Sequence, residues 1–374
     1  MNRQGSPSEV FRVFLRLGLT SFGGPIAHLG YFRDELVTRR RWLDDAAYAD
    51  LVALCQFLPG PASSQVGFAL GLMRAGWRGA AAAFLAFTLP SALILMIFAM
   101  GWGAGGGALA GLKIVAVAIV AQAVLGMART LCPDRERASI AVMAVVLLAL
   151  LPTAVGMIGA IIAGAAAGLA LGRGQARPPA HAPRLAVTRR QSLLAAIAFV
   201  LLLILGTGLF GGFFRAGALV FGGGHVVLPL LEQATVAQGW LSHDSFLAGY
   251  GAAQAVPGPL FTFAAYLGMA IDGIPGAVIA LAAIFLPGFL ILIAALPHWD
   301  RLRQAALAQS AMQGANAAVV GILGAALYDP VFTGGIGDMG DFALALAGFV
   351  ALVAWRMPPW VVVAASAAVG ALMV

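Results

Sequence analysis

Apolar segments long enough to cross a lipid bilayer recur along almost the whole chain, and this feature most restricts how it can fold. A helix needs about 17–25 mostly apolar residues to cross the hydrocarbon core. Hydrophobic residues make up 61% of the sequence and charged residues only 10%, well away from the balance of soluble domains. The candidate segments are 10–32, 48–73, 78–100, 108–129, 138–152, 154–172, 191–210, 212–232, 246–270, 274–296, 308–328, 342–357 and 358–374. We therefore expect an all-α polytopic membrane protein.

The formal net charge of +7 sits mainly in short loops beside these segments. An excess of arginine in such loops marks their cytoplasmic side, so the charge indicates membrane orientation and no nucleic-acid partner. Cys55 and Cys132 are far apart in the sequence and form no C-x-x-C pattern. The sequence therefore predicts no disulfide, no metal site and no cofactor.

The two halves of the chain are related in sequence. Residues 14–25 (FLRLG…FGGP) reappear as 213–224 (FFRAG…FGGG), an offset of 199. Three later landmarks follow in the same order, with offsets that drift only from 198 to 197: W-L at 42–43 and 240–241, Q-x-x-P-G-P at 56–61 and 254–259, and L-P at 89–90 and 286–287. This ordered set predicts membrane repeats at 1–172 and 191–374. Between them, the arginine- and proline-rich segment 173–190 reads as a basic cytoplasmic linker.

The first two segments raise a question of topology. Arg33 and Arg39–Arg41 would lie outside if both segments crossed the bilayer, against the positive-inside rule. They stay inside if each segment is a re-entrant hairpin that turns at Gly23-Gly24-Pro25 and at Pro59-Gly60-Pro61. Hairpins are favoured, and a kinked full span is the alternative.

Loop charge gives the second half the opposite orientation. The stretch 232–244 has no lysine or arginine, whereas Arg301 and Arg303 follow the next span. The extra segment 191–210 supplies the inversion whether the broken segments turn back or cross. The sequence therefore predicts two inverted-topology repeats with broken or re-entrant helices, an architecture common in secondary transporters.

The glycine- and proline-rich breaks are the predicted substrate site. Broken helices in such transporters aim helix N-termini at the substrate, and unpaired N–H groups there suit an anion. Glycine permits close backbone approach, and proline at a helix start loses no needed donor. The substrate-binding candidates are Gly23, Gly24, Pro25, Pro59, Gly60, Pro61, Gly222, Gly223, Gly224, Pro257, Gly258 and Pro259. The alternative is that these residues form ordinary kinks or packing points.

Polar side chains flank the breaks. Gln56 and Gln254 precede the two P-G-P elements at matching positions, and Ser63, Ser64, Gln65 and Thr262 follow them. They could either donate hydrogen bonds to an oxyanion or cap the freed backbone. Gln56 and Gln254 join the substrate-binding candidates.

Arg16 and Arg215 occupy matching positions ahead of the F-G-G elements. An arginine inside a membrane is costly and its planar fork suits an oxyanion, so both are substrate-binding candidates. The alternative is snorkelling of both side chains to the headgroups. Lys113, with Asn316 as its rough counterpart, is a weaker candidate.

His28 and His225 each follow an F-G-G element, though not at equivalent positions. A histidine can titrate near neutral pH, so either could couple transport to protons. A neutral, hydrogen-bonded histidine at a helix end is the alternative. Enzyme signatures such as H-E-x-x-H, Walker A or G-x-S-x-G in a plausible context are missing, so the sequence predicts a transporter and no enzyme.

Several of these motifs together resemble the chromate ion transporter family in its long-chain, two-domain form. They are FGGPIAHLGYFR at 22–33, QFLPGP at 56–61, FGGGHVVLPLL at 221–231, QAVPGP at 254–259, NAAVVG at 316–321 and YDP at 328–330. The first half departs from the pattern, with KIVAVA at 113–118 where the second half has NAAVVG. This departure weakens a strictly symmetric assignment of substrate contacts.

The resemblance implies a multi-pass inner-membrane protein that exports chromate, driven by the proton motive force, and confers chromate resistance. The implied partners are chromate or a sulfate-like oxyanion and the lipid bilayer, and a homodimer remains possible. Sulfate is chemically similar, so a sulfate or other oxyanion carrier is the main alternative. An intramembrane enzyme and a passive channel are more distant ones.

Overall fold

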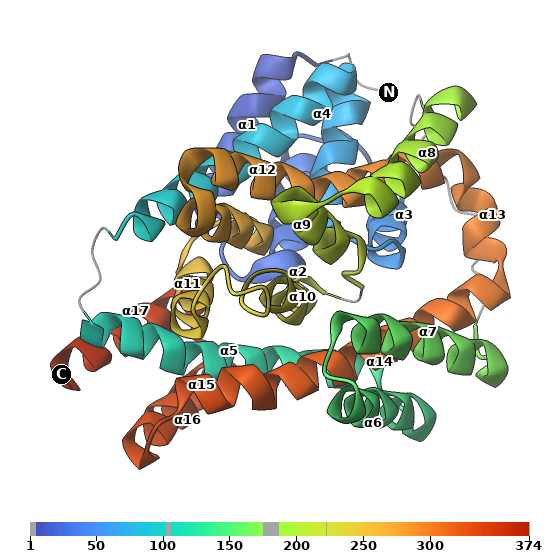
Figure 1. Ribbon diagram of the computed structural model, residues 1–374. Helices are drawn as coiled ribbons and strands as arrows, with labels where there is room; N and C mark the ends of the chain where they lie inside the picture. Colours follow the sequence, from blue (N-terminus) through green and yellow to red (C-terminus); the bar gives the residue numbers. More distant parts are fainter. Residues whose placement is uncertain (1–4, 102–105, 175–186, 222, 374) are drawn as a thin grey trace.

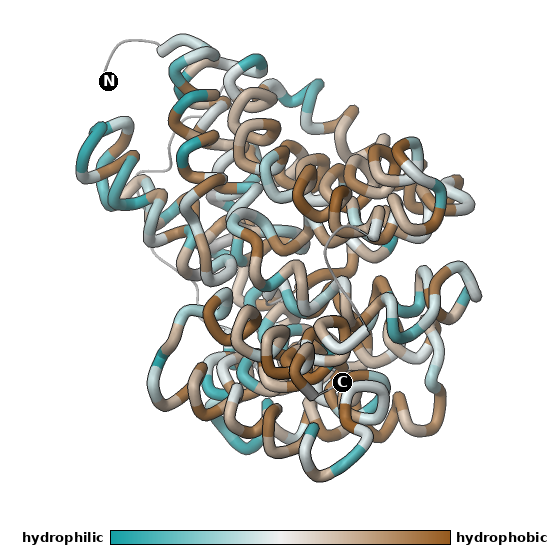
Figure 2. Tube along the Cα trace, turned by 90° about the vertical axis from the view of Figure 1, so that its left-hand side faces the viewer, coloured by the Kyte–Doolittle hydropathy of each residue, from teal (hydrophilic) through white to brown (hydrophobic). Residues whose placement is uncertain are grey.

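The computed structural model describes residues 5–101, 106–174, 187–221 and 223–373, and the regular elements in these ranges are all helical. Five helical stretches are long and apolar enough to cross a membrane: Ala62–Ala99, Gly106–Leu131, Ala154–Leu171, Leu260–His298 and Ala306–Gly335. Large apolar side chains such as Val146, Leu201 and Leu205 are exposed on the outside of the molecule, and Figure 2 shows apolar stretches on outer helices. Such a surface suits lipid, and the prediction of an all-α polytopic membrane protein is confirmed.

The helices follow one another in the same order in both halves (Figure 1). Half one contains α1 (Pro7–Thr20), α2 (Gly24–Phe32), α3 (Asp45–Phe57), α4 (Ala62–Ala99), α5 (Gly106–Leu131), α6 (Arg135–Leu150) and α7 (Ala154–Leu171). Half two contains α9 (Gly208–Ala218), α10 (Val227–Thr235), α11 (His243–Ala255), α12 (Phe263–Ala295), α14 (Ala306–Ala326), α16 (Met339–Val353) and α17 (Pro359–Met373). Between the halves lies α8 (Arg189–Leu205), the extra segment predicted from sequence, and the short α13 (Trp299–Gln304) and α15 (Thr333–Gly335) complete the α-helices of the described residues. Residues 175–186 of the predicted linker lie outside the described ranges, so the predicted domain boundaries stay a prediction.

The first two segments of half one turn back on themselves. Glu9 near the start of α1 pairs with Arg74 at 3.1 Å, and the Arg74 guanidinium lies 5.2 Å from the ring centre of Trp42. Trp42 precedes α3, and Arg74 ends the first arm of α4. Glu9, Trp42 and Arg74 therefore lie at the same end of the molecule. Because the chain returns to this end after α2 and again after the first arm of α4, α1 and α2 form one helical hairpin, and α3 and that arm form a second.

Half two repeats the two hairpins. A methyl group on Gly212, early in α9, would lie 3.4 Å from Cβ of Ala234, late in α10. The hydroxyl of Tyr266 donates to the carbonyl of Ser245 at the start of α11 (2.9 Å). The first contact joins the open ends of the α9–α10 hairpin, and the second ties α12 back to the start of α11, so the F-G-G and P-G-P elements are hairpin tips in this half as well.

Each half also contains a sharp bend that separates two predicted segments. Helix α4 leaves helical geometry at Ala75 and Gly76, and α12 does so at Asp272 and Gly273. Both glycines have positive φ, 64° and 61°, which other residues rarely adopt. The bends fall in the gaps between the predicted segments 48–73 and 78–100 and between 246–270 and 274–296, so those boundaries are confirmed.

The remaining long helices form a second layer, drawn below the hairpins in Figure 1, in which the halves exchange partners. Helix α5 packs against α16 and α17, whereas α14 packs against α6 and α7. Small residues allow backbone contact at both crossings: Gly111 meets Ser366 and Gly370, and Gly314 meets Gly164 and Gly168. This is the small-residue packing typical of membrane helices, used twice in equivalent places.

Helices α5 and α14 hold the same place in their halves and run antiparallel. The beginning of α5 contacts the chain beyond the end of α14, because a methyl group on Gly335 would lie 3.1 Å from the carbonyl of Lys113. Towards the other end of α5, the sulfur of Cys132 lies 4.0 Å from the carbonyl of Ala317 in α14. Antiparallel packing of equivalent helices is what inverted repeats require.

The inverted arrangement predicts opposite labelling of two equivalent loops. In a parent with Cys55 and Cys132 replaced by alanine, we expect Arg39→Cys and Ala237→Cys to react with a membrane-impermeant maleimide from opposite sides of the membrane. Ser8→Cys should label from the same side as Arg39→Cys, because the hairpins return the chain to that side.

Labelling of positions 39 and 237 from one side would contradict the inverted repeat. Labelling of positions 8 and 39 from opposite sides would contradict the hairpins.

Candidate functional site

The four hairpin tips meet at one place, where each half bonds to the other. The amide of Gly60 donates to the carbonyl of Val220 (2.8 Å), and the amide of Gly258 donates to the carbonyl of Ser21 (2.9 Å). Gly60 and Gly258 are repeat equivalents, and so are Ser21 and Val220. Each P-G-P tip is therefore joined to the F-G-G tip of the opposite half, and we name the meeting of the four tips the tip junction.

The junction has approximate twofold symmetry. Pro25 and Gly224 are repeat equivalents and touch: a methyl group on Gly224 would lie 3.2 Å from Cγ of Pro25. An approximate axis therefore passes between these two residues. Two further contacts are related by this axis. Gly60 lies against Gly288, and its equivalent Gly258 lies against Ser91, the equivalent of Gly288.

Glycine is required at the tips for two physical reasons. Gly60 and Gly258 have positive φ of 117° and 100°, and so does Gly23 at 99°. A methyl group on Gly60 would lie 2.9 Å from Cα of Gly288, and one on Gly258 would lie 2.8 Å from Oγ of Ser91. Positive φ and close contact therefore both exclude a side chain at the two P-G-P glycines.

The helical segments that leave the junction begin without side-chain caps. Within the part of the chain that the structure describes, no side chain caps the starts of α2, α4, the 3₁₀ turn Gly224–Val226 that leads into α10, or the turn Leu260–Thr262 that leads into α12. Elsewhere α1, α3, α6, α7, α8, α11 and α16 are each capped by a serine, threonine or aspartate, whereas α9, α13 and α14 also begin without a side-chain cap. A helix N-terminus has N–H groups with no helical partner and a partial positive charge. At the junction, then, such donors remain open to a ligand.

Two of the predicted polar residues bind the freed backbone. The amide nitrogen of Gln65 donates to the carbonyls of Pro59 (3.0 Å) and Gly288 (2.8 Å), which links the P-G-P tip of half one to α12. The hydroxyl of Thr262 donates to the carbonyl of Pro259 (2.7 Å). Of the two roles expected from the sequence, Gln65 and Thr262 therefore have the second: they bind backbone carbonyls freed at the breaks.

The two predicted arginines lie on exposed faces of their helices. Arg16 is exposed on α1, and Arg215 is exposed on α9 with its guanidinium donating to the carbonyl of Gly206 (2.8 Å). Gly206 precedes α9, so the Arg215 side chain extends away from the junction. The structure does not bring the Arg215 guanidinium into the junction.

The two predicted glutamines differ in their surroundings. Gln56 is exposed, whereas Gln254 is half-buried and its Nε2 is fully buried without a partner among the described residues. Gln254 lies beside Tyr250, whose hydroxyl is 2.8 Å from Nδ1 of His225. The structure thus brings one predicted glutamine and one predicted histidine together through a tyrosine that sequence analysis did not single out.

His28 is buried in half one. Its Nδ1 lies 3.4 Å from the hydroxyl of Ser63, and its ring meets Phe87 edge-on with centroids 5.4 Å apart.

The remaining predicted candidates lie in the tips themselves: Gly23, Gly24, Pro25, Pro59, Pro61, Gly223, Gly224, Pro257 and Pro259. Gly222 lies outside the described residues. Ser21 and Thr88, both buried near the junction, were missed because nothing in the local sequence distinguishes them from ordinary helix residues.

Lys113, the weaker candidate, is paired. Its ammonium lies 2.9 Å from Asp244 at the start of α11, so the ion pair joins the second layer to a hairpin. This pairing explains how the charge is accommodated near the beginning of α5. Sequence analysis could not identify the partner, because Asp244 is 131 residues away.

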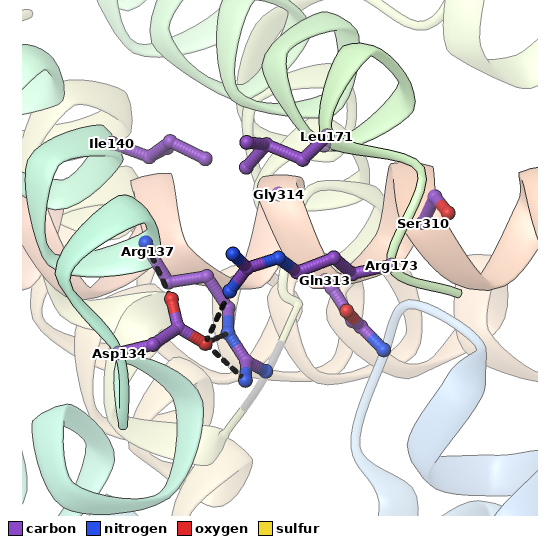
Figure 3. A pocket seen from close by; sticks show the side chains of 9 residues that line it. Asp134, Arg137, Ile140, Leu171, Arg173, Ser310, Gln313 and Gly314 are labelled. Carbon is purple, nitrogen blue, oxygen red and sulfur yellow. Dashed lines mark hydrogen bonds and ion pairs between the residues drawn. The ribbon is translucent and has the colours of Figure 1, made fainter. Parts of the chain in front are cut away.

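A small cavity lies apart from the junction, between the α5–α6 connection, α7 and α14 (Figure 3). Its charged residues are paired: Arg137 with Asp134, and Arg173 with Glu136 at 2.6 Å. The hydrogen bond from the Arg137 side chain lowers the pKa of Asp134 to about 2, so this carboxylate stays charged at any physiological pH. These ion pairs therefore hold the start of α6 and Arg173, just beyond the end of α7, together.

Comparison with known proteins relates both halves to one family. The chromate transporter family matches residues 8–169 and 207–371. A chromate transport protein of Pseudomonas aeruginosa is 30% identical, over 93% of this chain and 87% of its own length. A probable chromate transport protein of Synechococcus elongatus is also 30% identical, over 94% and 91%. A chromate transport protein of Cupriavidus metallidurans is 29% identical, over 84% and 80%. No solved structure gives a significant match to the chain.

The contacts of the P-G-P glycines predict that one added methyl group destabilises the junction. We expect Gly258→Ala to lower the free energy of unfolding by about 1–3 kcal/mol more than Gly172→Ala does. Both positions have positive φ, but Gly172 faces open space whereas Gly258 meets Ser91. Denaturant unfolding in detergent micelles measures the difference, and equal losses in the two variants would contradict the close contact.

Proposed function

The chain belongs to the chromate transporter family, and on that premise we propose that it is a secondary transporter that moves chromate out of the cytoplasm. The proposed driving force is the proton motive force, and the proposed result for the cell is chromate resistance. Transport of chromate follows from family membership and the names of the relatives. Direction, coupling and resistance are the proposed refinements.

One observation supports the tip junction as the anion site. The reciprocal hydrogen bonds Gly60–Val220 and Gly258–Ser21 hold four uncapped helix starts around one centre. Chromate is a tetrahedral dianion with four acceptor oxygens and no donor, so a converging set of N–H donors matches its chemistry. Inverted-repeat transporters place their sites between broken helices in the same way.

The junction would bind the anion mainly through neutral donors. Because Arg215 extends away from the tips and Arg16 is exposed, we propose that these arginines attract an arriving anion to the protein and do not contact it in the junction. Gln254 is proposed to contact the anion as it passes through the half-two side of the junction, where its half-buried side chain lies beside Tyr250.

Proton coupling is proposed for the two histidines near the tips. His28 and His225 each hydrogen-bond a hydroxyl through Nδ1, to Ser63 and Tyr250 respectively. A change of protonation at either ring would alter these bonds next to the tips, which is how proton binding could be linked to anion binding.

Export predicts gradient-dependent uptake of chromate into everted membrane vesicles. We expect vesicles that contain the protein to accumulate chromate when their interior is acidified, and to lose that accumulation when a protonophore collapses the gradient. Excess sulfate in the assay tests which oxyanion is preferred.

Gradient-independent equilibration of chromate would indicate a passive channel and contradict the coupling. Accumulation of sulfate without chromate would reassign the substrate.

Removing the Gln254 side chain should slow chromate transport specifically. We expect Gln254→Ala to reduce the initial rate of chromate uptake about tenfold at low substrate concentration, because it removes one hydrogen bond to a charged ligand. Gln238→Ala, on an exposed position between α10 and α11, serves as the matched control and should leave uptake unchanged. Equal rates in Gln254→Ala and wild type, at equal protein in the membrane, would remove Gln254 from the site.

A further inference from the structure

Polar side chains are distributed unequally about the approximate twofold axis of the junction. Ser21, His28, Ser64 and Thr88 all belong to half one and are 0%, 1%, 3% and 1% exposed. Each has a buried polar atom without a partner among the described residues: Oγ of Ser21, Nε2 of His28, Oγ of Ser64 and Oγ1 of Thr88. We name these four residues the half-one polar cluster.

The equivalent positions of half two are apolar or satisfied. Ser21, His28 and Thr88 correspond to Val220, Val227 and Phe285, which are at most 1% exposed. Ser64 corresponds to Thr262, whose hydroxyl donates to the carbonyl of Pro259. The fold therefore tolerates apolar side chains at three of these places, and the polar atoms of half one are not required to build a hairpin tip.

Side-chain contacts of His28 run along the cluster near the start of α4. Nδ1 of His28 contacts the hydroxyl of Ser63, the neighbour of Ser64, and the imidazole also lies next to the backbone of Ser21. The His28 ring packs on Phe87, the neighbour of Thr88. These contacts place Ser21, together with Ser63 and Phe87, the sequence neighbours of Ser64 and Thr88, against one imidazole.

The P-G-P tip of half two closes the cluster from the other side. The amide of Gly258 donates to the carbonyl of Ser21. A methyl group on Gly258 would lie 3.3 Å from the carbonyl of Phe87, which precedes Thr88. The cluster therefore lies between the first turn of α4 and the opposite half.

Buried polar atoms without partners destabilise a fold, so four of them at one place require a reason. The first turn of α4, which is uncapped, adds its own free N–H groups beside Ser63 and Ser64. Hydroxyl, imidazole and backbone N–H groups can all donate to the same acceptor. A ligand with several acceptor oxygens would satisfy them together, whereas an apolar ligand would satisfy none.

We propose that a single tetrahedral oxyanion binds off the approximate axis, on the half-one side. Its ligands are the first-turn amides of α4, the hydroxyls of Ser21, Ser64 and Thr88, and Nε2–H of His28. This inference rests on the proposed function and deepens it: substrate contacts are asymmetric although the fold is nearly symmetric. The Nδ1 contact with Ser63 orients the imidazole so that Nε2 faces the anion.

Binding of chromate and of sulfate to the purified protein in detergent, measured by equilibrium dialysis, tests the proposal. We expect Thr88→Val and Ser21→Ala to weaken chromate binding by about tenfold or more, because each removes a hydrogen bond to a charged ligand. Thr235→Val is the matched control: this buried threonine lies in half two and its hydroxyl already donates to the carbonyl of Leu231 (2.7 Å). Its chromate affinity should equal that of the wild type.

Thermal unfolding of the same variants without anion separates a ligand role from a structural one. Thr88→Val and Ser21→Ala should be as stable as the wild type or more stable, since each removes a polar atom that has no partner. Thr235→Val should be no more stable than the wild type, since its hydroxyl has a partner.

The outcomes are distinguishable. Weaker binding with retained stability supports the proposal, and Ser64→Ala repeats the test independently. Wild-type affinity in Thr88→Val, Ser21→Ala and Ser64→Ala overturns the asymmetric site alone. Reduced stability in all three shows that the hydroxyls are structural and also overturns it. A wild-type protein that binds neither chromate nor sulfate overturns the proposed function together with this inference.

Discussion

Two backbone hydrogen bonds between opposite halves are the constraint on which the tip junction depends. A hairpin that turns inside a membrane frees backbone groups, and the surrounding hydrocarbon cannot satisfy them. Here the amides of Gly60 and Gly258 satisfy the carbonyls of Val220 and Ser21 in the opposite half. Neither half can make these bonds alone, so the duplication and its inversion are physically necessary for the tips as they stand.

The same bonds decide what the junction can bind. They use the carbonyls that end the incoming helices and the glycine amides within the P-G-P elements. The N–H groups at the uncapped starts of the outgoing helices remain, and these favour an anion. The contact between the tips therefore leaves mainly hydrogen-bond donors at the junction. Such a surface suits an anion, as expected for a member of the chromate transporter family.

The architecture of the hairpins was predictable because glycine and proline have few structural uses inside an apolar segment. The repeated F-G-G and P-G-P elements, the extra helix α8 and the loop charges together predicted broken, inverted repeats. The side-chain environment was not predictable to the same degree. Exposure of Arg16 and Gln56 depends on which helix face meets a neighbour, and the hairpin segments are apolar on most faces. Pairing of Lys113 with Asp244 depends on contact between residues far apart in sequence. Ser21 and Thr88 become notable only through burial without partners.

A duplicated fold does not require a duplicated site. Half two keeps the backbone geometry of the tips, with positive φ at Gly258 as at Gly60, but has valine and phenylalanine where half one has serine, histidine and threonine. Backbone hydrogen bonds preserve the symmetric frame, whereas the side chains are free to specialise. The most direct test of this account is a structure of the protein with bound chromate, in which anomalous scattering locates the chromium. We expect chromium beside Ser64 and His28, at the first turn of α4. Chromium beside Arg16 or Arg215 on the exposed faces of α1 or α9 would contradict it.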